Sequence, residues 1–250
     1  MNRSDYTKTI SLIKTYVAEE KDWYGDELSY DAAAKSSVLP VSAADTARAD
    51  AERVLMKKSS SALEKLRKEI CDCVRCPLGK TRINFVFGTG NPRARLMFVG
   101  EGPGFSEDHQ GEPFIGRAGK MLTKIIEAMG MLRSDVYIAN IVKCHPMKDA
   151  SNPELHGNDR PPTPEEMAFC MPYLERQIEC IKPVVICTLG TTASQGLLGV
   201  DTVIGKLRGN MVDYKKYKLM PTYHPAALLR NPALKRDLWE DMKQIKKILA

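Results

Sequence analysis

Four runs of apolar residues, each short enough to form one strand, mark the chain from residue 95 onward. Their near-continuous apolar character is typical of parallel strands that are buried on both faces of a sheet. The runs span residues 95–99, 136–142, 184–189 and 217–223. Segments with helical periodicity occupy residues 117–129, 164–181, 191–198 and 233–249. This alternation predicts a doubly wound α/β sandwich, in which ligands bind at the carboxyl ends of the strands.

The N-terminal quarter of the chain has a weaker pattern. Residues 5–20 repeat apolar side chains at helical spacing, which predicts an amphipathic helix within residues 1–30. Residues 31–60 contain eight Ala, five Ser and no aromatic residue. Such a segment buries little apolar surface, so we expect residues 31–62 to form a linker or a loose helix. The main domain is predicted over residues 63–250.

Composition and charge narrow the class of protein. Of the 250 residues, 43% are hydrophobic and 27% are charged, which excludes a membrane protein or a fibre. No apolar run approaches the roughly 18 residues that span a bilayer, and no signal segment opens the chain, so we expect a soluble, cytoplasmic protein. The net charge is +6, and residues 71–250 carry all of the excess. This modest basic surplus suits a polyanion such as nucleic acid.

Conspicuous chemistry follows three of the predicted strands, in the segments GEGPG, NIVKCHP and YHP. A dinucleotide-binding loop would continue GEGPG to a third glycine and directly into a helix, but Phe105 stands at that glycine position. A tight surface turn is the plain alternative. Carboxylates and an aromatic residue follow closely, which favours a substrate pocket instead; the residues are Glu101, Glu107, Asp108, Pro113 and Phe114.

The seven cysteines are an odd number, which argues against a disulfide framework in a cytosolic chain. Metal or cluster ligation is the natural role for some of them. A C-x2-C pair supplies two thiolates at a nearly fixed separation, and two distant cysteines complete a set of four. Zinc accepts the same set, so the number of ligands leaves the metal open. The cysteines are Cys71, Cys73, Cys76, Cys144, Cys170, Cys180 and Cys187.

Taken together, the motifs resemble those of the family 4, or type-4, uracil-DNA glycosylases. The matching segments are GEGPGFSEDHQGEPFIGRAG (100–119), YIANIVKCHP (137–146) and PTYHPAALLRNP (221–232), with Cys73-x2-Cys76 upstream. The resemblance covers roughly residues 70–249. It implies a three-layer α/β/α sandwich with a four-stranded parallel sheet. It also implies a base-excision repair enzyme that flips uracil out of DNA and hydrolyses its N-glycosidic bond, leaving an abasic site.

The same resemblance implies a 4Fe–4S cluster on Cys73, Cys76, Cys144 and Cys170. We expect this cluster to have a structural role. Cys71 does not match the family's spacing, and Cys180 and Cys187 are expected to be plain buried thiols. The segment between Cys144 and Cys170 is longer than is usual in the family. Its excess, about residues 148–160, is rich in Asn, Asp, Gly and Pro, which predicts a surface loop.

Five residues form the uracil pocket by resemblance: Glu101, Gly102, Phe114, Asn140 and His224. Phe114 would stack on the base, and Asn140 would pair with its N3–H and O4. His224 would donate a hydrogen bond to O2 of the departing uracil. Without the resemblance, each of these three has a plain structural alternative, as a core, turn or capping residue.

The resemblance also implies a catalytic group of His224, Glu101 and Glu107, with Leu228 as a wedge that enters the DNA. Relatives outside family 4 have an Asp where Gly102 stands, and that Asp handles the attacking water. Neither glutamate can be assigned this role from the sequence. Lys80 and Arg230 are candidate phosphate contacts.

The expected partner is uracil-containing DNA, single- or double-stranded. We expect a monomer, with the N-terminal helix available to dock another protein. Two other functions stay open: a glycosylase for another deaminated base, and an inactive iron–sulfur module that binds DNA or other proteins. The presence of Glu101, Asn140 and His224 argues against the inactive module. Product-trapping relatives carry a basic insertion after the first motif, whereas here Gly119 leads directly into a helix.

Overall fold

The computed structural model describes residues 43–250. The predicted helix within residues 1–30 and the first part of the predicted linker lie outside this range. A six-stranded sheet in the order β1-β3-β2-β4-β6-β5 forms the centre. Its four inner strands are parallel, and β1 and β5 pair antiparallel at the two edges. The strands are β1 (Thr89–Gly90), β2 (Leu96–Gly100), β3 (Tyr137–Asn140), β4 (Val185–Leu189), β5 (Val212–Tyr214) and β6 (Tyr217–Thr222).

The prediction of an α/β fold is confirmed, and the prediction of four strands is incomplete. The parallel strands coincide with the four apolar runs. The edge strands escaped prediction because β1 has only two residues and β5 has three, too few to show an alternating pattern. Both edges are therefore short, which limits unwanted pairing with other chains.

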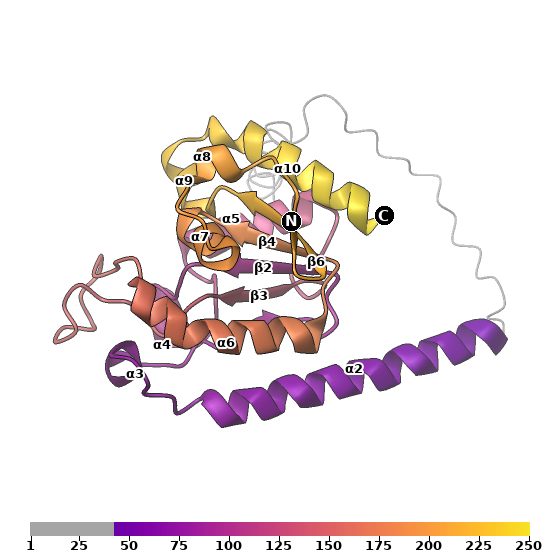
Figure 1. The fold of residues 1–250 in the computed structure, drawn as a ribbon, viewed down its shortest axis with the longest axis horizontal. Coiled ribbons are helices and arrows are strands. Elements are labelled where there is room, and N and C mark those ends of the chain that lie inside the picture. The colour runs from indigo at the N-terminus through magenta and orange to yellow at the C-terminus, as the bar shows by residue number, and fades with distance from the viewer. Residues whose placement is uncertain (1–42) are drawn as a thin grey trace, which may run out of the picture. The chain divides into compact units, whose positions relative to one another are not determined.

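Helices cover both faces of the sheet, with α6 on one side of the strands and α10 on the other (Figure 1). Side chains of β2 alternate between the two layers: Met97 and Val99 join the apolar cluster with α6, whereas Leu96 and Phe98 are buried outside that cluster. The helices are α2 (Ala43–Ile70), α3 (Leu78–Thr81), α4 (Phe105–Gln110), α5 (Arg117–Ala128), α6 (Pro164–Ile181), α7 (Thr191–Leu198), α8 (Ile204–Leu207), α9 (Pro225–Arg230) and α10 (Leu234–Leu249).

The described part of the predicted linker is helical. From Ala43 the chain forms one continuous helix, α2, to Ile70. This span contains no Gly or Pro and is rich in Ala, which has the highest helix propensity. Within residues 53–70 of this helix, the buried side chains are Leu63, Leu66 and Ile70, which join the apolar cluster with α6. Among the side chains described, contributions to the core thus begin at Leu63, within a longer helix.

The parallel strands bring distant motifs to one edge of the sheet. The strands β2, β3 and β6 end at Gly100, Asn140 and Thr222, and a conspicuous motif follows each of them. Helix α4 begins at Phe105, directly after Gly104, which is its N-cap. No helix in residues 43–250 is long and apolar enough to cross a membrane.

Removing residues 1–60 should leave the main domain folded, because the buried turns of α2 start at Leu63. We expect the melting temperature to change by less than about 4 °C, which corresponds to a change of ~1 kcal/mol in the free energy of unfolding. Leu66→Ala in the full chain should instead cost ~2–5 kcal/mol, because Leu66 is 2% exposed. Calorimetry of both variants measures the difference. An unfolded truncation would show that residues before Leu63 support the core.

Candidate functional site

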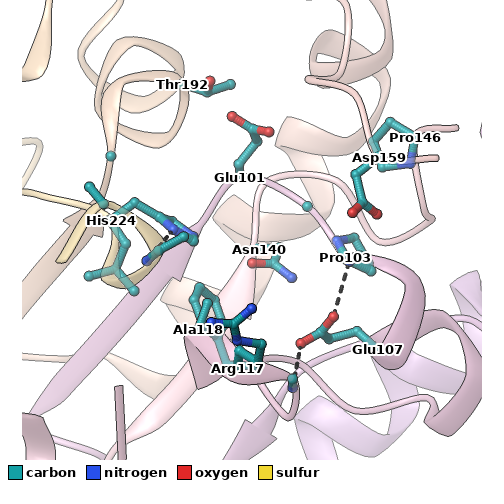
Figure 2. A pocket seen from close by; sticks show the side chains of 18 of the residues that line it. Glu101, Pro103, Glu107, Arg117, Ala118, Asn140, Pro146, Asp159, Thr192 and His224 are labelled. Carbon is teal, nitrogen blue, oxygen red and sulfur yellow. Dashed lines mark hydrogen bonds between the residues drawn. The ribbon is translucent and has the colours of Figure 1, made fainter. Parts of the chain in front are cut away.

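A cavity of about 650 Å³ lies where the parallel strands end (Figure 2). Its walls come from the segments that follow β2, β3, β4 and β6, together with the start of α5. Six of the predicted site residues line it: Glu101, Gly102, Glu107, Phe114, Asn140 and His224. The topology therefore brings together residues that are separated by more than a hundred positions in the sequence.

Two glycines allow Phe114 to form a wall of the cavity. A Cβ at Gly100 would lie 2.5 Å from the Phe114 ring, and a Cβ at Gly119 would lie 1.9 Å from the Phe114 carbonyl oxygen. Phe114 itself has φ 54°, a left-handed conformation that is costly for an aromatic residue. Its ring centroid is 5.6 Å from that of His224. The loop thus holds an aromatic face in a position that the backbone would not adopt by preference.

Asn140 brings an unpaired acceptor into the cavity. The residue ends β3 and is 1% exposed. Its Oδ1 atom is buried and has no hydrogen-bond partner among residues 43–250. A buried polar atom left unpaired costs ~1–3 kcal/mol, so this oxygen is suited to a ligand that carries an N–H donor.

Lys143 supports the strand end behind Asn140 and was not singled out from the sequence. Its fully buried Nζ donates to the Asn140 carbonyl oxygen at 2.7 Å and to Gln177 Oε1 at 2.6 Å. Burial lowers the pKa of Lys143 to about 7. The residue comes directly after the apolar run 136–142, and nothing in that pattern indicates that a lysine following it would be buried.

His224 is the N-cap of α9 and offers a neutral donor. The backbone N–H of Ala226 donates to His224 Nδ1 at 3.2 Å, so a neutral imidazole carries its hydrogen on Nε2. Burial, with a smaller effect of the Arg230 charge, lowers the pKa of His224 to about 4. At neutral pH the residue can therefore donate a hydrogen bond without being charged.

Glu107 holds the glycine loop together. Its Oε1 accepts from the backbone N–H groups of Ile115 and Gly116, each at 3.0 Å. Its Oε2 accepts from the N–H of Gly104 at 3.2 Å (Figure 2). Both oxygens are engaged by the backbone, so Glu107 holds this loop in position, and its catalytic role stays a prediction from the sequence.

Glu101 lies beside Thr192, a residue that the sequence reasoning missed (Figure 2). Burial raises the pKa of Glu101, and a hydrogen bond from Thr192 opposes this effect. The carboxyl group is thus held at the start of α7, on the side of the cavity that faces this helix. Thr192 lies at the start of α7, after the apolar strand β4, where Thr is common. No feature of the sequence therefore marks it as a site residue.

No sequence pattern indicated the cluster of charged residues beside the cavity, which consists of Asp108, His145 and Asp159. His145 is fully buried, with Nε2 2.7 Å from Asp159 Oδ1. Its Nδ1 lies 3.5 Å from Asp108 Oδ2, an ion-pair distance. Burial alone lowers the pKa of His145, but the two carboxylates outweigh it and raise the pKa to about 9. Asp159 lines the cavity, so the segment predicted as a plain surface loop contributes to the site.

The predicted wedge residue, Leu228, is buried in this structure. Leu228 is 1% exposed, whereas Leu229 is 38% exposed. The cavity is lined by Ala226, Ala227 and Arg230, and the helical period turns position 228 away from that face. The motif in the sequence contains two adjacent leucines, and only the helix phase shows which of them is buried.

The four cysteines implied as ligands come from three segments of the chain, one of which is α6. Cys73 and Cys76 lie between α2 and α3, Cys144 follows β3, and Cys170 belongs to α6. Burial, together with the negative charges of neighbouring cysteines, raises the pKa of Cys170 and takes the pKa of Cys144 to about 12. These mutual effects connect Cys144 with Cys170 and Cys76, and Cys170 with Cys73.

Hydrogen-bond donors accompany these sulfur atoms. Arg82 Nη1 donates to Cys144 Sγ at 3.1 Å, and the backbone N–H of Lys143 donates to Cys170 Sγ. Cys71 differs, because its Sγ donates to the Lys68 carbonyl oxygen at 3.5 Å. In residues 43–250, no three His, Cys, Asp or Glu side chains form a compact single-ion site. A thiol-only set with such donors has the chemistry that suits an iron–sulfur cluster.

The sequence is similar to those of known proteins. The model of the uracil DNA glycosylase superfamily matches residues 87–243. A type-4 uracil-DNA glycosylase of Archaeoglobus fulgidus is 42% identical over 192 residues, which cover 74% of this chain and 92% of that protein. A type-4 uracil-DNA glycosylase of Thermotoga maritima is 44% identical over 191 residues, which cover 75% of this chain and 94% of that protein.

The ionisation of His224 should penalise folding at acid pH. In an unfolded chain its pKa is near 6.5, and in the folded protein it is about 4. The unfolded state therefore takes up a proton first, so stability falls as the pH drops below about 6.5, by ~1 kcal/mol at pH 5.5. An NMR titration of the imidazole measures this pKa, with His224→Gln to assign the resonance. A midpoint near 6.5 would contradict the neutral-donor role.

Proposed function

Because the chain belongs to the uracil-DNA glycosylase superfamily, and within it to the type-4 group, we propose that it removes uracil from DNA. The enzyme flips the base out of the stack and hydrolyses the bond between uracil N1 and deoxyribose C1′, which leaves an abasic site. The observation that carries this proposal is the buried, unpaired Oδ1 of Asn140, set in one cavity with the ring of Phe114 and the neutral imidazole of His224.

Asn140 has the donor and acceptor that uracil requires. Its Oδ1 accepts from uracil N3–H, and its amide group donates to O4. Cytosine has an acceptor at N3 and a donor at position 4, so both contacts would be mismatched. Each buried group left unmatched costs ~1–3 kcal/mol, and Phe114 adds a stacking face that any base can use. Discrimination therefore comes from Asn140 rather than from stacking.

His224 stabilises the departing base. As the C1′–N1 bond breaks, its electron pair stays with uracil, and negative charge grows on O2. The Nε2–H of the neutral imidazole donates to that oxygen, in the manner of an oxyanion hole. The sugar becomes an oxocarbenium cation, to which water then adds at C1′.

DNA contacts surround the cavity mouth. We assign the wedge that fills the gap left by the flipped base to Leu229, since it is the exposed leucine of α9. Arg230, on the cavity rim, is placed for a phosphate contact. Lys80 stays a candidate for a similar contact. Monomeric state, cytoplasmic location and a docking role for the N-terminal residues stay predictions from the sequence.

We propose that Cys73, Cys76, Cys144 and Cys170 hold a 4Fe–4S cluster. When bound, the cluster would supply iron–thiolate bonds that join α6, the segment after β3 and the loop between α2 and α3. The donors beside the sulfur atoms support this assignment, because Arg82 Nη1 donates to Cys144 Sγ at 3.1 Å and the backbone N–H of Lys143 donates to Cys170 Sγ. The role proposed for the cluster is structural.

Asn140→Asp tests the proposed function. The wild-type protein should release uracil from an oligonucleotide and leave cytosine in place. The variant keeps the side-chain shape but loses the donor to O4, so uracil release should fall by at least tenfold, or the preference for uracil over cytosine should weaken. Chromatography of released bases measures both. No uracil release by the wild-type protein would refute the function and favour the inactive module, whereas unchanged behaviour of the variant would remove Asn140 from base recognition.

The cluster makes a prediction of its own. The purified protein should be brown, with iron and sulfide in about a four-to-four ratio. Cys144→Ala should lose this colour, whereas Cys187→Ala should retain it, because Cys187 belongs to β4 and is not one of the proposed ligands. Visible absorbance and metal analysis give the result. A colourless protein with one zinc ion per chain would show that the cysteines hold a different metal.

A further inference from the structure

Three carboxylates line the cavity: Glu101, Glu107 and Asp159. Both oxygens of Glu107 are engaged by backbone N–H groups, and Glu101 is drawn toward Thr192. We propose that Asp159 is a catalytic residue of this site. Its carboxylate faces the reacting sugar and accepts a proton from the attacking water. This inference rests on the proposed function, because it assigns a further group to the same reaction.

The loop that carries Asp159 is docked on α4. The Phe105 ring lies between the rings of His109 and His156, with a centroid distance of 4.1 Å to each. The Nε2 atom of His109 also lies 3.1 Å from Glu154. These contacts join the long segment between Cys144 and Cys170 to the helix that follows the glycine motif. The loop is thereby fixed against the cavity wall, and Asp159 is fixed with it.

One oxygen of Asp159 is fixed and the other is available. His145 Nε2 lies 2.7 Å from Oδ1, and the backbone N–H of Phe105 donates to the same atom at 3.2 Å. Both contacts are made to Oδ1, so they leave Oδ2 for a ligand. The side chain is 56% exposed, which gives water access to it. Asp108 holds His145 from the opposite side, so His145 and Asp108 act as positioning residues for this carboxylate.

The position of Asp159 compensates for the missing side chain at Gly102. A Cβ at Gly102 would meet Val142 at 2.7 Å and Pro146 at 3.5 Å, so the strand end has no room for a carboxylate of its own. Asp159 is held close to the same proline, because the backbone N–H of the next residue, Arg160, donates to the Pro146 carbonyl oxygen at 3.0 Å. Figure 2 shows Asp159 beside Pro146, on the opposite side of the cavity from His224.

This arrangement divides the reaction between two sides of the cavity. On the side of His224, the C1′–N1 bond breaks and its electron pair leaves with uracil. On the side of Asp159, a lone pair of the water oxygen forms the new bond to C1′, and the water proton passes to Asp159 Oδ2. Asp159 then releases this proton to solvent, and the uracil anion takes one from solvent. The products are the abasic sugar and uracil, and no other reactant is needed.

Asp159→Asn tests the role of the carboxylate. The amide preserves the size and an acceptor for His145, but it cannot take the proton and presents no negative charge to the oxocarbenium cation. We expect the single-turnover rate of uracil release to fall by ~10²–10³, within the usual range for general-base catalysis, while the Kd for uracil-containing DNA changes by less than about twofold. Asp149→Asn is the matched control, because Asp149 lies in the same loop, bonded to Ser151 outside the cavity, and this variant should keep the wild-type rate.

Chemical rescue separates catalysis from structure. In Asp159→Ala, added formate should restore part of the lost rate, because a small carboxylate can occupy the vacated space. Formate should not rescue His224→Ala, which lacks a donor rather than a base. A rate for Asp159→Asn within about threefold of wild type would overturn the proposal. So would a loss accompanied by weaker DNA binding and no formate rescue, which would give Asp159 a loop-positioning role only. If the wild-type protein releases no uracil, the proposed function itself fails.

Discussion

The site depends on one constraint, which is that parallel strands end at the same edge of a sheet. Asn140 is the last residue of β3, and Glu101 and His224 come just after β2 and β6. The pairing of β2 with β3 and β4, and of β4 with β6, brings these strand ends together. Hydrogen bonding between strands thus sets distances among residues that are far apart in the chain. Close packing at Gly100 then fixes the fine geometry, since no larger residue would leave space for Phe114 and Asn140 together.

Much of this arrangement could be predicted from the sequence, because it follows from local patterns. Apolar runs located the four parallel strands, and the three motifs identified most of the cavity. What could not be predicted has a common physical origin. Leu228 and Leu229 differ only in helix phase, and Glu107 differs from a substrate-facing carboxylate only in what its oxygens contact. The cluster of Asp108, His145 and Asp159 depends on the path of a long loop, for which no periodicity exists.

Desolvation gives the ionisable groups of the cavity different properties. Burial keeps His224 neutral and raises the pKa of Glu101, since a charged form loses its hydration in each case. At Asp159, the hydrogen bond from His145 outweighs burial and lowers the pKa, so this carboxylate stays ionised. One side of the cavity thus offers a neutral donor to a developing anion, and the other offers a negative charge to a developing cation. The polarity of the cavity matches the charge separation in the reaction.

The three backbone N–H groups that Glu107 binds have a consequence for affinity. A glycine-rich loop has a large conformational entropy when it is free, and ordering it around a ligand would consume much of the binding energy. A single side chain ties Gly104 to Ile115 and Gly116 before any base arrives. The entropy of this loop is therefore lost during folding. The free energy released when a base enters the cavity can then offset the cost of removing that base from the stack.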